Sequence, residues 1–172
     1  LVDMTISNSG NGTGAISDSF FNPPVNTKYC NDDYKDTICI SNSDKKKEPI
    51  KNFVSSTVYF IGDTVVNNTN HHDFKESVLI INGNLEAQNF KSDNVSIFVN
   101  GNTSFDHFEV NNLSLYSSGT LILTKHITIS NSKIRSIGPL QVINNSNEQM
   151  KITNSHLLME GLNNYIESLD VK

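Results

Sequence analysis

Hydrophobic and polar residues alternate over short stretches that lead into regularly spaced glycines. Two mainly apolar rows stand four and two positions before the glycines from Gly62 to Gly161. Successive residues of a strand point to opposite sides of a sheet, so both rows share one side, and we predict that this side is buried. The rows are Val58, Leu79, Ile97, Leu115, Ile134 and Leu157, and then Phe60, Ile81, Val99, Ser117, Ser136 and Met159.

The same counting predicts two further inward strands in each repeat. One begins two residues after the Gly and the other ends two residues before a recurrent Asn. Three short strands per repeat, each with alternate residues inward, indicate a coil with three sides. The inward residues are Thr64, Val66, Leu85, Ala87, Thr103, Phe105, Leu121 and Leu123, and then Phe90, Ser92, Phe108, Val110, Ile127, Ile129, Met150 and Ile152.

The repeat itself is an Asn followed seven residues later by a Gly. A period of about 20 residues indicates a solenoid or an array. Asn suits left-handed and tight-turn positions and can bond to the Asn of the next coil, while Gly suits a corner that needs a positive φ. The predicted corner ladder is Asn94, Asn112, Asn131 and Asn154 with Gly83, Gly101, Gly119, Gly138 and Gly161; Ser55, Glu76 and Gly62 extend it toward the N-terminus.

These patterns predict an all-β fold, a parallel β-solenoid of five to six short coils stacked ~4.8 Å apart. Two insertions, at residues 67–74 and 144–149, account for the longer repeats. A β-sandwich or jelly roll also uses many short strands. It would not hold Asn and Gly at a fixed offset four times over.

The chain divides into residues 1–56, which do not follow the repeat, and a solenoid over residues 57–172. We expect the first segment to be an irregular cap, because an open coil exposes core and unpaired backbone. A separate small binding module is the alternative. Cys30 and Cys39 are an even pair with a short loop between them, which predicts one disulfide and an oxidising compartment.

Composition supports this picture and narrows the partners. Asn occurs 25 times, Trp is absent and the net charge is −5. Asn favours turns over helix interiors. The negative charge argues against general binding of nucleic acid. No apolar run is long enough to span a membrane, so we predict no membrane span in this chain.

One outward row is largely apolar and is the predicted interaction face. A contiguous exposed apolar stripe normally marks an interface. Either residues 1–56 or the tail of the same chain pack over it, or another molecule does. The stripe lies three residues before each Gly and consists of Tyr59, Ile80, Phe98, Tyr116 and Arg135, followed by Leu158.

Two other outward rows are polar. His107 and His126 are expected to be neighbours on adjacent coils, in a row with His71, but no third ligand converges on them, so we predict no metal site. The other row, three residues before each Asn, alternates in sign and predicts cross-coil ion pairs of modest strength. It consists of Asp73, Lys91, Glu109, Thr128 and Lys151.

Nothing in the repeat predicts catalysis or a cofactor. Solenoid enzymes need acids clustered on one outward face, and here no two acids fall on adjacent coils of one row. The chain contains no Gly-rich phosphate loop before a helix and no Cys-based metal motif. We therefore predict a non-enzymatic protein.

The stretch Ile80-Ile81-Asn82-Gly83-Asn84-Leu85 is followed by Phe98-Val99-Asn100-Gly101-Asn102-Thr103. These "NGN" rungs resemble those of bacterial surface β-solenoids, such as adhesin passengers and the solenoid domains of some minor pilins. The resemblance extends over about residues 57 to 165. It implies an extracellular or cell-surface module, periplasmic before assembly, whose partners are filament subunits or a host ligand.

The expected function is adhesion or assembly of a pilus or filament. The alternative is a carbohydrate-binding or carbohydrate-active protein that uses the inserted loops around His71 and Asn145. A weaker alternative is a DNA-capturing pilus tip, with Lys45 to Lys47 as its local positive charge.

The chain contains six N-glycosylation sequons. Two of them begin at Asn94 and Asn112 of the ladder, where a glycan would not fit the predicted corner. This favours a bacterial source.

Overall fold

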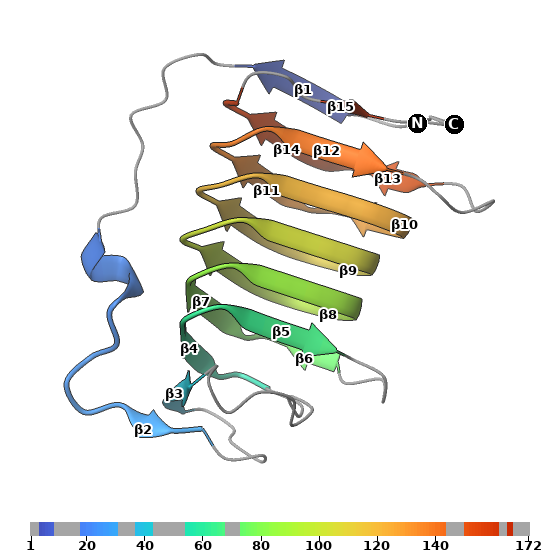
Figure 1. The fold of residues 1–172 in the computed structure, drawn as a ribbon. Coiled ribbons are helices and arrows are strands. Elements are labelled where there is room, and N and C mark those ends of the chain that lie inside the picture. Colours follow the sequence, from blue (N-terminus) through green and yellow to red (C-terminus); the bar gives the residue numbers. More distant parts are fainter. Residues whose placement is uncertain are drawn as a thin grey trace.

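A computed structural model of the chain describes residues 4–8, 18–30, 37–42, 54–67, 73–143, 150–161 and 165–166. Within these residues, fifteen strands form one sheet that coils into a parallel β-solenoid of about 5 turns, as predicted (Figure 1). The elements are β1 (Met4–Asn8), the short 3-10 helix η1 (Asp18–Phe21), β2 (Lys28–Tyr29), β3 (Ile38–Asn42), β4 (Thr57–Ile61), β5 (Thr64–Asn67), β6 (Asp73–Lys75), β7 (Val78–Asn82), β8 (Leu85–Val99), β9 (Thr103–Ser117), β10 (Leu121–Ser130), β11 (Lys133–Ser136), β12 (Leu140–Ile143), β13 (Lys151–Thr153), β14 (Ser155–Met159) and β15 (Tyr165–Ile166).

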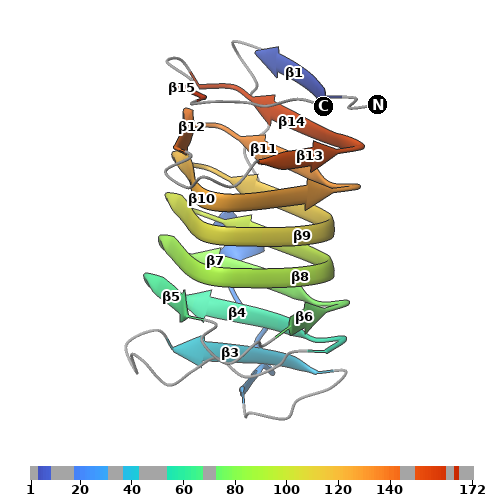
Figure 2. The same ribbon diagram turned by 90° about the vertical axis from the view of Figure 1, so that its right-hand side faces the viewer.

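The rod has three faces, which are numbered here by their strands. Face 1 contains β4, β7, β11, β14 and the last parts of β8 and β9. Face 2 contains β5, β12 and the first parts of β8, β9 and β10, and face 3 contains β6, β13 and the remaining parts of the same three strands. Every pairing is parallel, and the coils stack as successive rungs (Figure 2).

The inward rows fill the core as the alternation predicts. None of the predicted inward residues exposes more than 7% of its surface. Ser117 and Ser136 are buried although polar, because their hydroxyls bond to carbonyls at the adjacent corner. Ser136 Oγ donates to Gly119 O at 3.1 Å and to Gly138 O at 2.8 Å.

Phenylalanines from faces 2 and 3 meet inside the lower coils. The rings of Phe74 and Phe90 stack at 5.4 Å, and those of Phe90 and Phe108 stack at 6.1 Å, one coil apart each time. Phe105 of face 2 closes on Phe108 at 4.2 Å. The parallel register therefore produces a ladder of like residues inside the rod as well as at its corners.

The N-terminal segment reaches both ends of the solenoid. β3 pairs with β4 and β2 pairs with β3, so these two strands continue face 1 beyond the first predicted coil. β1, the first strand in the chain, pairs with β14 at the opposite end, where β15 adds to β12 (Figure 1). Strands from residues 1–56 thus cover both the β14 edge and the β4 edge of face 1.

The predicted disulfide is present. Cys30 and Cys39 are bonded with their Cα atoms 4.9 Å apart. Cys39 is fully buried in register with Val58, and Cys30 packs against the same core cluster. The bond joins β3 to the residue that follows β2, and such bonds persist mainly in oxidising compartments outside the cytosol.

Candidate functional site

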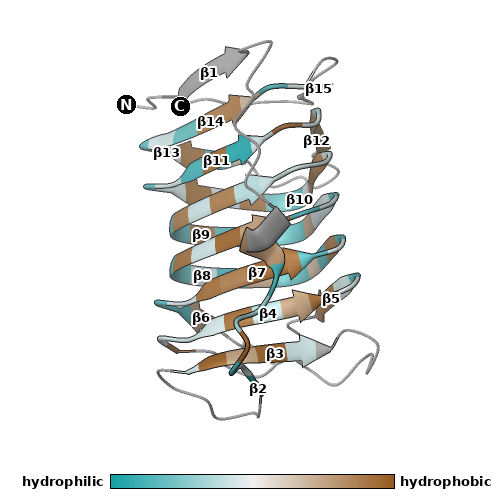
Figure 3. Cartoon of the chain, turned by 90° about the vertical axis from the view of Figure 1, so that its left-hand side faces the viewer, coloured by the Kyte–Doolittle hydropathy of each residue, from teal (hydrophilic) through white to brown (hydrophobic). Residues whose placement is uncertain are grey.

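The apolar stripe of face 1 is covered over its centre by η1. Ile80 and Tyr116 expose only 4% and 7% of their surface, while Tyr59 and Phe98 are half-buried. Phe21 of η1 is buried against this cluster. η1 lies beside the stack in Figure 1, and Figure 3 shows the hydrophobic segments of β7 and β8 on this face.

A second aromatic side chain of η1 extends the cover. The ring of Phe20 meets Phe98 edge-on at 4.9 Å and stays partly exposed. Of the two interpretations that the sequence left open, cover by residues 1–56 applies to the centre of the stripe. Its use as an interface with another molecule stays a prediction.

Arg135, which lies beside Leu158 in the stripe, is one half of an ion pair. Its Nη2 donates to Glu160 Oε1 at 2.7 Å, and its guanidinium lies 5.9 Å from the ring centre of Tyr116. The Glu160 side chain is only 6% exposed. Arg135 is therefore held in place by a carboxylate and a ring, which suits a structural role more than the capture of an anion.

The predicted Asn ladder forms the left-handed corner between faces 3 and 1. Asn112 Nδ2 donates to Asn94 Oδ1 at 3.1 Å, and Asn154 Nδ2 donates to Asn131 Oδ1 at 2.7 Å. Between them Asn131 bonds to Asn111 Oδ1 instead. All six corner residues have a positive φ: 52° at Ser55, 48° at Glu76, 56° at Asn94, 52° at Asn112, 50° at Asn131 and 48° at Asn154.

The Gly corner has a different physical cause from the one expected. Among the described glycines, positive φ values occur at Gly62 and Gly83 alone, so backbone conformation does not explain the later ones. The cause is close stacking. A Cβ added at Gly138 would lie within 3.0 Å of the backbone of Gly119 in the coil beneath, and the same holds along the row.

A third corner, between faces 2 and 3, is also left-handed. Its residues Asn89, His107 and Lys125 have φ values of 51°, 53° and 62°. The register shifts between Thr124 and Ile127, so that two residues oppose His107. This β-bulge puts a lysine at the corner in place of the expected histidine.

The bulge gathers charged and aromatic side chains. Lys125 Nζ donates to Asp106 Oδ2 at 2.6 Å, and Asp106 Oδ1 lies 2.9 Å from His107 Nδ1. Partial burial raises the pKa of Asp106, but the hydrogen bonds and charges of Lys125 and His107 outweigh it and lower that pKa below its ordinary value. The rings of His107 and His126 stack at 6.4 Å, which confirms that they are neighbours. His71 lies outside the described residues.

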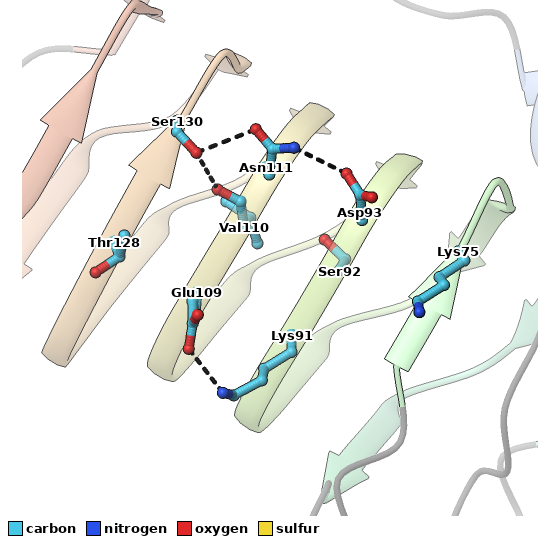
Figure 4. Close-up of a pocket in the computed structure, with 9 residues that line it drawn as sticks. All are labelled: Lys75, Lys91, Ser92, Asp93, Glu109, Val110, Asn111, Thr128 and Ser130. Atoms are coloured by element: carbon cyan, nitrogen blue, oxygen red, sulfur yellow. Dashed lines mark hydrogen bonds and ion pairs between the residues drawn. The ribbon is translucent and has the colours of Figure 1, made fainter.

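Face 3 carries a shallow trough of about 330 Å³ between two polar rows. One is the predicted row of alternating charge. The second stands directly before the Asn corner, and the same counting would have found it. The residues that line the trough are Lys75, Lys91, Ser92, Asp93, Glu109, Val110, Asn111, Thr128 and Ser130 (Figure 4).

Most polar groups of the trough bond to one another. Lys91 Nζ pairs with Glu109 Oε2 at 2.8 Å, which confirms the predicted cross-coil pairing. On the other side Asn111 Nδ2 donates to Asp93 Oδ1 at 2.9 Å and Ser130 Oγ donates to Asn111 Oδ1 at 3.2 Å (Figure 4). The trough is open to water and presents amide, hydroxyl and charged groups along the rod.

Metal ligands do not converge in the described part of the chain. No group of three or more His, Cys, Asp or Glu side chains there could hold an ion. The charged run at Asp44 to Glu48 and the inserted loops at 68–72 and 144–149, with Asn145, lie outside the described residues. The described faces offer elongated surfaces for contact.

No helix in the described residues is long and apolar enough to cross a bilayer. No family model, no curated protein and no solved structure matches the chain. The fold and the surfaces described above are therefore the basis for a function.

Proposed function

We propose that this protein is a non-enzymatic extracellular module of a bacterial surface structure, an adhesion or filament component that presents a rigid solenoid face. One observation carries the proposal: strands from the N-terminal segment cover the β14 and β4 edges of face 1, so the coils form one continuous stack with long outward faces. Such a rod is suited to holding a binding surface away from the cell and presenting it to a partner.

Two features support the location and source. The Cys30–Cys39 bond favours an oxidising compartment. Asn94 and Asn112 begin sequons, yet the amide nitrogen of Asn112 is already used in the ladder. A glycan on that nitrogen would displace the bond, which favours a cell that does not modify sequons.

The test is deletion of the gene in the source bacterium, with complementation by the full chain. We expect antibody to label intact wild-type cells, and deletion to abolish the label together with adhesion or surface filaments. Complementation restores both. Label that appears only after permeabilisation, or unchanged adhesion and filaments, would reject the proposal.

The trough on face 3 supports a second candidate, binding of an extended carbohydrate. Its amide and hydroxyl groups recur at the rung spacing, and hydroxyl-rich polymers bond to such groups. Glycan-array binding that is lost in Asn111→Ala and kept in Glu86→Ala, an exposed change on face 2, would favour this candidate. Equal glycan-array signals from the two variants would reject the carbohydrate candidate and leave the display role in place.

A further inference from the structure

The closing strand β1 is attached to the rest of the fold along one edge. It pairs over five residues with β14, from Met4 opposite Ser155 to Asn8 opposite Met159. Leu157 and Met159 of β14 are 2% exposed and belong to the core. Without a strand in this position, the β14 edge would present unpaired backbone groups.

The chain starts β1 at the end of the rod that lies farthest from β2. The sheet path along face 1 runs β1-β14-β11-β9-β8-β7-β4-β3-β2, so β1 and β2 are its two ends. η1, between them in sequence, packs on residues of β7, β8 and β9 in the middle of the path. The donor strand and its acceptor edge thus stand at the same end, while the chain that follows η1 stands at the other.

The length of the connection allows β1 to reach two edges. Nine residues, 9–17, join β1 to η1 and include Gly10, Gly12 and Gly14. Fully extended, nine residues span ~30 Å. From β8, the middle of the η1 site, β1 is four steps away along the path, or ~19 Å at the usual strand spacing.

A second copy can stack with its β14 facing β2 of the first copy. The position for β1 between these two strands is five steps from β8 of the first copy, or ~24 Å. This distance is also within reach, and η1 need not leave its own site. All face 1 pairings are parallel, so a copy translated along the rod offers β14 in the right direction. β1 would then lie between its own β2 and the neighbour's β14.

We propose that β1 is exchanged between copies, so that β1 of one copy pairs with β14 of the copy beneath it and the rods join head to tail. The partner is a second copy of this chain. The contacts are those of the closed form, so the balance depends on local concentration. This inference rests on the proposed filament role and names the contact that would join one subunit to the next.

The test mixes two single variants of the full chain, Thr5→Cys and His156→Cys, whose positions are paired in register. The control mixture replaces the second with Glu86→Cys, an exposed position on face 2. Under mild oxidation we expect roughly tenfold more mixed dimer in the first mixture at high concentration, since paired strands bring the Cα atoms within disulfide range. Equal yields in the two mixtures would overturn the exchange.

A second measurement locks the closed form. The double variant Thr5→Cys/His156→Cys, oxidised while dilute, cannot lend its β1 to another copy. Sedimentation should show that the locked protein stays a monomer and that the wild-type protein, which keeps Cys30–Cys39 but lacks the lock, assembles as concentration rises. Assembly of the locked protein would overturn the exchange, while surface location and adhesion of the parent chain would still stand or fall separately. Ser7→Cys with Leu158→Cys, a pair in register two residues farther along the same strands, repeats both measurements if the first pair folds poorly.

Discussion

The Asn corner and the Gly corner turn the same chain by different means. At the Asn corner the backbone is left-handed in every coil, and Ser55 and Glu76 occupy the position as well as four asparagines. At the Gly corner the coils approach so closely that a Cβ would meet the neighbouring backbone. The first corner demands a conformation and accepts several residues; the second demands empty space and accepts one.

The comparison separates two kinds of repetition in a solenoid. A conformational demand costs about 1–2 kcal/mol when an ordinary residue meets it. A clash with backbone cannot be relieved by moving a side chain, so the backbone of both coils must shift. Substitutions at the two corners should therefore differ in how much they lower the free energy of unfolding.

The largest effect is expected for Gly138→Ala. The three nearest atoms to the added Cβ are all backbone atoms of Gly119 and Thr120, so two coils must separate. We expect a loss of about 3 kcal/mol in the free energy of unfolding. Urea unfolding measures it, with Ser118→Ala at the same corner as the control. Similar midpoints for the two variants would contradict the steric account.

Ser132→Ala probes the residue that follows the Asn corner. Ser132 Oγ accepts from Leu113 N at 3.0 Å and donates to Ser130 O at 2.6 Å, inside the core. Its removal leaves a buried amide without a partner, and we expect a loss of about 2 kcal/mol. Ser130→Ala, whose hydroxyl is near the surface, is the control and should lose much less. A loss in Ser132→Ala no larger than about 0.5 kcal/mol would show that the inner hydroxyl is not needed.

Asn112 sharpens the conformational half of the comparison. With φ at 52°, Asn112→Ala should lose about 1–2 kcal/mol. Asn112→Gly keeps the backbone angle and loses the exposed bond to Asn94, so we expect a loss below about 1 kcal/mol. Thermal unfolding of the two variants tests the order. Equal losses would assign the corner to the side-chain bond and not to the backbone.

The smallest effect is expected at the third corner, in Asp106→Asn. Because the pKa of Asp106 is lowered in the fold, its carboxylate adds stability above the ordinary value of 3.8, and this is lost as pH falls through the lower folded pKa. The difference between wild type and variant should be under about 1 kcal/mol at neutral pH and should vanish in acid. Unfolding measured from pH 7 to pH 2 tests this, and a difference that persists at the acid end would contradict it.

Periodicity predicted the core of the rod because each coil repeats the same burial. Counting from the glycines placed Leu79, Ile97 and Leu115 inside, and it also placed Ser117 inside, against its polarity. The Asn corner followed from the known backbone preference of that residue. His107 and His126 were placed side by side by the same count.

The parts that do not repeat could not be predicted in this way. Nothing local to Met4–Asn8 indicates that it pairs with β14, about 150 residues away in the chain, since an edge accepts any strand of suitable direction. Phe20 and Phe21 carry no periodic signal, so the sequence does not show which segment covers the stripe. The bulge at Lys125 needed one residue more than the count allowed.

The nine-residue connection between β1 and η1 also acts as a gauge of rod length. Each added coil would move β14 ~4.8 Å farther from the η1 site, while the connection would keep its reach of ~30 Å. Two extra coils would bring the closed form to the limit, and a third would leave β1 short of its own β14. A lineage that lengthened the rod without lengthening this segment would lose its self-closed monomer, and the lower end, unchanged in distance, would be the only edge that β1 still reached.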